Sequence, residues 1–163
     1  MADLQSHKNQ ADHNLDFLVV ANNDQQENWD WQVTIAFYAG VHLINAHLAR
    51  SVNLHYRTHT DVNEAIDFGN STSLARLPEE VYLQYRALFN LSRRSRYLIH
   101  ENNPKADELI PHLTHERHFK KAIKYLDRII DYMREKYSID CQKRPIRCLD
   151  IKQNTLNNFN VVQ

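Results

Sequence analysis

The sequence predicts an all-α protein: a four- to five-helix up-and-down bundle followed by an extended or irregular C-terminal tail. Glycine and proline are scarce, with 2 and 4 among 163 residues, whereas β-hairpins and Greek keys need glycine-rich turns. Long segments contain neither residue, which suits long helices. The segment after Thr114 also carries apolar residues at the spacing of one helix face.

Two helices are expected in the N-terminal part of the chain. The first spans Ser6–Ala21, where apolar residues recur at helical spacing. The second spans Glu27–Ser51 and contains the apolar run Val33–Ile44, which places this helix at the centre of the bundle. Gly40 within that run predicts the close approach of a neighbouring helix. The run is too short to cross a bilayer, so we expect no membrane insertion.

The remaining elements are predicted from their end signals. A short helix is expected over Asp61–Phe68 and a long one from Pro78 to His100, where a proline starts the helix and Pro104 follows its end. The last helix runs from a cap at Thr114 to Tyr137. Residues 1–137 thus form the predicted bundle, and residues 138–163 form a tail that docks on it, stays flexible or wraps a partner.

Composition limits the classes of function. The 20 basic and 20 acidic residues cancel, so no global field directs the protein to nucleic acid or membrane. No glycine-rich phosphate loop or glycine-flanked serine is present, and no cofactor is expected. The polar N-terminus lacks a secretory segment, so a cytoplasmic location is predicted. Cys141 and Cys148 are then expected to be reduced thiols, with a disulfide or a metal site as the alternative.

Ten histidines make metal binding worth testing, and seven of them fall into three groups. His55 and His59 are four residues apart, His112, His115 and His118 recur every three residues, and His42 and His47 lie on the central helix. None of these groups has a complete set of zinc ligands, so no metal site is predicted. His42 is either a hydrogen-bonded core residue or a group aimed at a polar pocket.

An arginine cluster near the end of the long helix carries the strongest chemical signal. If that helix reaches His100, then Arg93, Arg96 and His100 share one face, while Arg94 points elsewhere. Two guanidinium groups beside an imidazole can hold a phosphate and transfer a proton near neutral pH. The alternative is a solvated basic helix end that the helix dipole favours.

Three segments together resemble the HEPN superfamily, in particular its small stand-alone prokaryotic members. They are Asp30-Trp31 with Tyr38-Ala39-Gly40-Val41-His42, the run Leu91–Tyr97, and His118-Phe119-Lys120-Lys121-Ala122. The resemblance covers about residues 6–137. It implies a helical bundle, a homodimer, and a metal-independent endoribonuclease or RNA-binding component of a toxin–antitoxin or phage-defence system. The surplus of aromatic residues on the third long helix, Tyr82, Tyr85 and Phe89, also favours a dimer surface.

The family motif is an arginine followed after four to six residues by a histidine. Arg93 and Arg94 both stand at that spacing from His100, so the resemblance implies that these three residues are catalytic. Two other classes of function stay open. One is a non-catalytic interaction bundle, as a partner subunit or antitoxin-like protein with a protein partner encoded nearby. The other is a bundle that binds a small ligand or nucleotide in a pocket lined by His42, His59, Arg96 and Tyr97.

Overall fold

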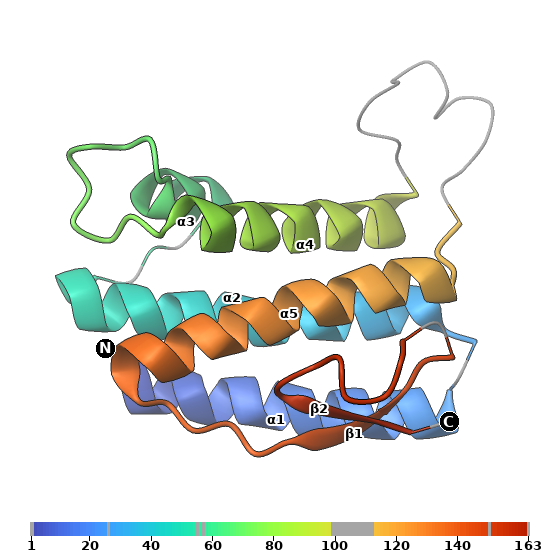
Figure 1. Ribbon diagram of the computed structural model, residues 1–163. Coiled ribbons are helices and arrows are strands. Elements are labelled where there is room, and N and C mark those ends of the chain that lie inside the picture. The colour runs from blue at the N-terminus through green and yellow to red at the C-terminus, as the bar shows by residue number, and fades with distance from the viewer. Residues whose placement is uncertain are drawn as a thin grey trace.

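The computed structural model describes residues 2–25, 27–54, 56, 58–98, 113–149 and 151–162. These residues form an all-α bundle with a C-terminal tail, as predicted (Figure 1). The elements are α1 (Leu4–Asp24), α2 (Trp29–Val52), α3 (His59–Ile66), α4 (Glu79–Tyr97), α5 (Glu116–Tyr137), β1 (Arg144–Arg147) and β2 (Phe159–Val162). No helix in the described ranges combines the length and the apolar content needed to cross a membrane.

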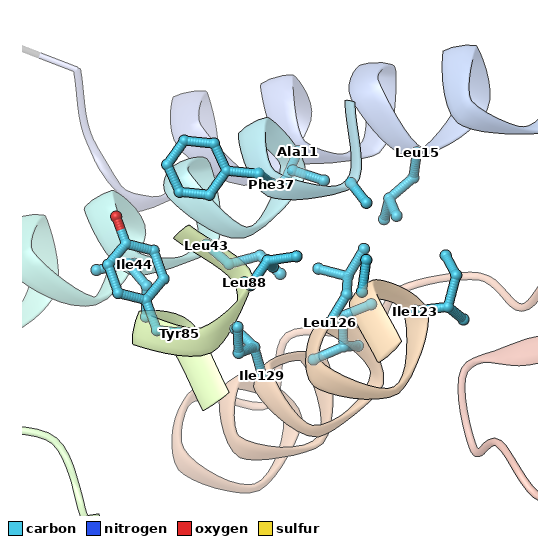
Figure 2. Close-up of a cluster of buried hydrophobic side chains, with 14 of the residues drawn as sticks. Ala11, Leu15, Phe37, Leu43, Ile44, Tyr85, Leu88, Ile123, Leu126 and Ile129 are labelled. Carbon is cyan, nitrogen blue, oxygen red and sulfur yellow. The ribbon is translucent and has the colours of Figure 1, made fainter. Parts of the chain in front are cut away.

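Helix α2 is the centre of the bundle, as its apolar run predicted. It packs against α1, α4 and α5, and Figure 1 shows α4 with the short α3 on one side and α1 with the tail on the other. Phe37 in the middle of α2 is completely buried. It belongs to a continuous core that α1, α2, α4 and α5 share (Figure 2).

Gly40 allows α4 to approach α2 closely. A Cβ atom added at Gly40 would lie 3.1 Å from Cδ2 of Leu88, which is tighter than ordinary van der Waals contact. It would also lie 3.8 Å from side-chain atoms of Leu126 and Ile129 on α5. The close approach predicted from this glycine is therefore confirmed.

Several predicted helix ends are wrong by a few residues, because local capping interactions determine where each helix begins and ends. The carboxylate of Asp3 accepts a hydrogen bond from the Ser6 N–H, so α1 begins before Ser6. Helix α4 ends at Tyr97 rather than near His100, because Leu98 adopts a left-handed conformation with φ 55°. Helix α5 is capped at His115 rather than at Thr114.

The tail docks on the bundle and is partly ordered into a sheet that the sequence did not predict. Strands β1 and β2 pair in parallel, with Arg144 opposite Phe159. The guanidinium group of Arg144 bonds to Asp16 and Asp12 of α1 at 2.7 and 3.1 Å, and Asn158 bonds to Asp127 of α5. Of the alternatives for the tail, docking is the one observed.

Candidate nucleic-acid interface

A groove of about 530 Å³ lies between α3 and α4. Helix α4 forms one wall, and α3 with the residue that follows it forms the other. The lining residues are His59, Thr60, Asn63, Glu64, Asp67, Tyr82, Arg86, Phe89 and Arg93. Most of them are polar or charged, so the groove suits a charged ligand better than an apolar one.

Arginines recur along the wall that α4 provides. Arg86 and Arg93 are seven residues apart, which is nearly two helical turns, so both lie on the same face. Their guanidinium carbons lie 5.5 and 5.7 Å from the centroid of the Phe89 ring between them, within the range of a cation–π interaction. Arg96 continues the row one turn later, and its guanidinium carbon lies 5.8 Å from the Phe37 ring.

His59 at the start of α3 faces this row of arginines. Its ring centroid lies 5.6 Å from that of Phe37 and 5.5 Å from that of Phe89. Partial burial, and to a lesser degree the positive charge of Arg96, lowers the pKa of His59 below its ordinary 6.5. At neutral pH the groove therefore holds an uncharged imidazole, able to accept a proton, beside guanidinium groups.

Two carboxylates line the groove as well. Asp67 is engaged within the fold, because it accepts hydrogen bonds from the Gly69 N–H at 2.8 Å and from the Tyr82 hydroxyl at 3.4 Å. Glu64 lies one turn of α3 closer to His59. The groove is thus basic along α4 and carries its carboxylates on the α3 side.

The structure brings together three of the four residues predicted to line a ligand pocket. Arg96 and His59 both contact the Phe37 ring, and the guanidinium carbon of Arg96 lies 5.2 Å from the Tyr97 ring. His42 lies elsewhere on α2, where its Nδ1 atom is 3.3 Å from Nδ1 of His7 on α1.

The predicted catalytic set is only partly placed. Arg93 lines the groove, whereas Arg94, the next residue, points about 100° away around the helix. His100 lies outside the described residues. Because α4 ends at Tyr97, the helical geometry that was expected to align His100 with Arg93 does not extend to it.

Two histidines from the other groups in the sequence have structural roles. His47 is buried and hydrogen-bonded within the core, and His118 caps α5 by accepting the His115 N–H at Nδ1 over 2.9 Å. His55 and His112 lie outside the described residues. Among the residues that the structure describes, no group of three or more histidines, cysteines or carboxylates could hold a metal ion.

The two cysteines are free thiols, which excludes the disulfide alternative between them. Both are buried in the docked tail. Burial, with a smaller contribution from the carboxylate of Asp12, raises the pKa of Cys141 above its ordinary value. Its thiol is therefore protonated near neutral pH and packs as a small apolar group.

Sequence analysis did not assign Arg86 to a site, and it interpreted the groove residues Tyr82 and Phe89 as part of a dimer surface. Arg86 and Phe89 lie on the same face of α4 as Arg93, a signal that helical spacing could have supplied. Tyr85, interpreted as part of a dimer surface, is buried in the core at 1% exposure. Figure 2 shows Tyr85 among the buried side chains of this core.

Comparisons with protein-family models, with curated proteins and with solved structures found no match for this chain. Its function must therefore be inferred from the geometry of the groove.

Proposed function

We propose that this chain binds RNA in the groove between α3 and α4 and cleaves it there without a metal ion. One observation carries the proposal: His59 lines the same groove as the guanidinium groups of Arg86 and Arg93. Arginine is suited to phosphate because its planar guanidinium group can donate two parallel hydrogen bonds. Both walls come from one chain, so the proposal does not depend on the predicted homodimer.

The chemistry that fits these groups is internal transesterification. The 2′-hydroxyl of a ribose attacks the adjacent phosphorus and gives up its proton to His59. A 2′-O–P bond forms while the bond to the 5′-oxygen breaks, which leaves a 2′,3′-cyclic phosphate. The departing 5′-oxygen takes a proton from water or from a second histidine, for which His100 remains the sequence candidate. Arg86 and Arg93 stabilise the negative charge that develops on the phosphate oxygens.

The first test is cleavage of mixed RNA by the purified protein in excess EDTA. We expect products that end in 2′,3′-cyclic phosphates, and the rate should fall by about 10²–10⁴-fold in His59→Ala, the usual loss when a general base is removed. His59→Phe separates chemistry from folding, because it keeps an aromatic ring against Phe37 and Phe89. His100→Ala tests the second proton-transfer group in the same assay.

Binding is measured separately from cleavage, on RNA lacking 2′-hydroxyls at the cleavable positions. Replacing a phosphate-binding arginine reduces the slope of log affinity against log salt by about 1, so Arg93→Ala should show that change. Lys124→Ala is the matched control, since it removes one positive charge from the exposed face of α5. Binding without cleavage would leave an RNA-binding bundle, and equal salt slopes for the wild type and Arg93→Ala would refute the groove as the binding site.

A further inference from the structure

A second, smaller cavity lies next to the groove, between α2 and the last turn of α4. Its volume is about 130 Å³, and it is lined by Asp30, Trp31, Thr34, Ser95 and Arg96. An engineered cavity of about 150 Å³ holds benzene, so this space suits one six-membered ring. It opens beside the groove because Arg96 follows Arg93 by three residues, about 4.5 Å along the helix axis.

The walls of this cavity combine an exposed aromatic face with buried polar groups. Trp31 is 64% exposed, whereas tryptophan side chains are highly buried on average. Thr34 and Ser95 are 5% and 4% exposed. The hydroxyl of Ser95 accepts a hydrogen bond from Thr114 at 2.9 Å, and its own proton can serve a ligand.

Two charged side chains with opposite hydrogen-bonding capacity also line the cavity. The Asp30 carboxylate offers only acceptors and the Arg96 guanidinium offers only donors. Arg96 is held in place, because it donates to the Ser92 carbonyl at 3.3 Å and to the Tyr38 hydroxyl at 3.4 Å. A ligand that fits both must carry a donor and an acceptor side by side on a flat ring.

We infer that this cavity holds one unpaired nucleobase of the bound RNA, and that it selects cytosine over uracil. The inference rests on the proposed RNA binding in the neighbouring groove. Cytosine has an exocyclic amino group that can donate to Asp30 and an adjacent ring nitrogen that can accept from Arg96. Uracil in the same orientation presents a carbonyl oxygen to Asp30 and an N–H donor to Arg96, so the order of donor and acceptor is reversed and both hydrogen bonds are lost. Trp31 supplies the stacking surface that unpaired bases use in protein complexes.

The test uses the Trp29→Phe variant, which leaves Trp31 as the only tryptophan. Trp29 packs on Phe119 with ring centroids 5.5 Å apart, and phenylalanine keeps an aromatic ring there. Short oligocytidine should quench the Trp31 emission, and oligouridine of equal length should bind about tenfold more weakly, as is typical of losing a base-specific hydrogen-bonded pair. The oligonucleotides carry 2′-O-methyl groups so that they are not cleaved.

Two substitutions complete the experiment. Asp30→Asn should abolish the preference for oligocytidine, because an amide can both donate and accept. Trp31→Ala, measured by the anisotropy of a labelled oligonucleotide, should weaken binding by about tenfold, as when a base-stacking aromatic is removed. Circular dichroism of each variant checks that the bundle is intact.

The outcomes separate this inference from the proposed function. Equal binding of the two oligonucleotides, or no effect of Trp31→Ala on a protein that still binds RNA, would refute the base pocket and leave RNA binding in place. Failure of the wild type to bind either oligonucleotide would refute both. A shift of Trp31 emission with protein concentration alone would show that a second copy of the chain covers the cavity, which also overturns the inference.

Discussion

At the scale of single residues, His47 shows how a buried polar side chain is satisfied in this core. Its Nε2 atom lies 2.7 Å from the carbonyl oxygen of Ala75, so Nε2 carries a proton and donates it. Its Nδ1 atom lies 2.6 Å from the hydroxyl oxygen of Tyr137 and accepts from it. One imidazole thus ties α2 to α5 and to the loop that precedes α4.

This arrangement makes the stability of the protein depend on pH. Burial, with a smaller effect of Lys136, lowers the pKa of His47 below 6.5, against the opposing effect of the bond to Ala75. The folded state therefore binds fewer protons than the unfolded chain, and the free energy of unfolding falls as the pH drops below about 6.5. His59, whose pKa is lowered too, acts in the same direction.

Urea unfolding at pH 7.5 and at pH 5 measures this effect. The wild type should lose more stability between these two values than His47→Gln, which has no titratable group at this position. The difference between the two losses isolates the contribution of His47. If both proteins lost the same amount, His47 would not be the source of the pH dependence.

At the scale of elements, the contact between α2 and α4 depends on the missing side chain of Gly40. The same close approach holds Arg96 of α4 against Phe37 and Tyr38 of α2. A larger residue at position 40 would push the two helices apart and widen both the core and the cavity beside Trp31.

Gly40→Leu is therefore expected to destabilise the protein by about 1–3 kcal/mol, the usual cost of overpacking a core. Thermal or urea unfolding measures this loss. The matched double variant Gly40→Leu with Leu88→Ala removes the side chain that lies 3.1 Å from the added Cβ. It should recover part of the stability relative to the sum of the two single changes. Strict additivity would mean that the helices do not meet at this point.

At the scale of the whole molecule, a buried carboxylate on α5 holds the second half of the tail on the bundle. Asp127 on α5 is 4% exposed. It accepts hydrogen bonds from the backbone N–H groups of Asn157 and Asn158 at 3.1 and 2.8 Å. The side-chain amide of Asn158 donates to the same carboxylate. These contacts position β2 beside β1 and close the tail over the bundle.

Asp127→Asn should loosen the tail, because hydrogen bonds to a charged group contribute about 1.5–3 kcal/mol each and a buried partner left unpaired adds a further cost. Limited proteolysis followed by mass analysis should show faster cleavage within residues 138–163. Glu135→Gln is the control, since Glu135 is an exposed carboxylate on the same helix. Equal cleavage of the two variants would contradict the assigned role of Asp127.

The sequence by itself determined the helical architecture, because helix formation depends on local patterns. Apolar spacing predicted α5, the continuous apolar run placed α2 at the centre, and Gly40 indicated a close neighbour. It also placed Arg93 and Arg96 on one face of a helix, since positions along a single helix are fixed by 3.6 residues per turn. Among the helices, only the ends differ from the prediction, because caps such as Asp3 and the left-handed Leu98 determine where α1 begins and where α4 ends.

The tertiary structure alone decided which helices bring their side chains together. His59 lines the same groove as Arg86 and Arg93 because α3 lies beside α4, and Trp31 lines the same cavity as Arg96 because α2 packs against α4. The parallel pairing of β1 with β2 likewise joins segments distant in the chain. Spacing along a sequence fixes angles around one helix axis. The angle and depth at which two helices pack depend on many side chains at once, so the groove and the cavity could not be derived from the pattern of residues.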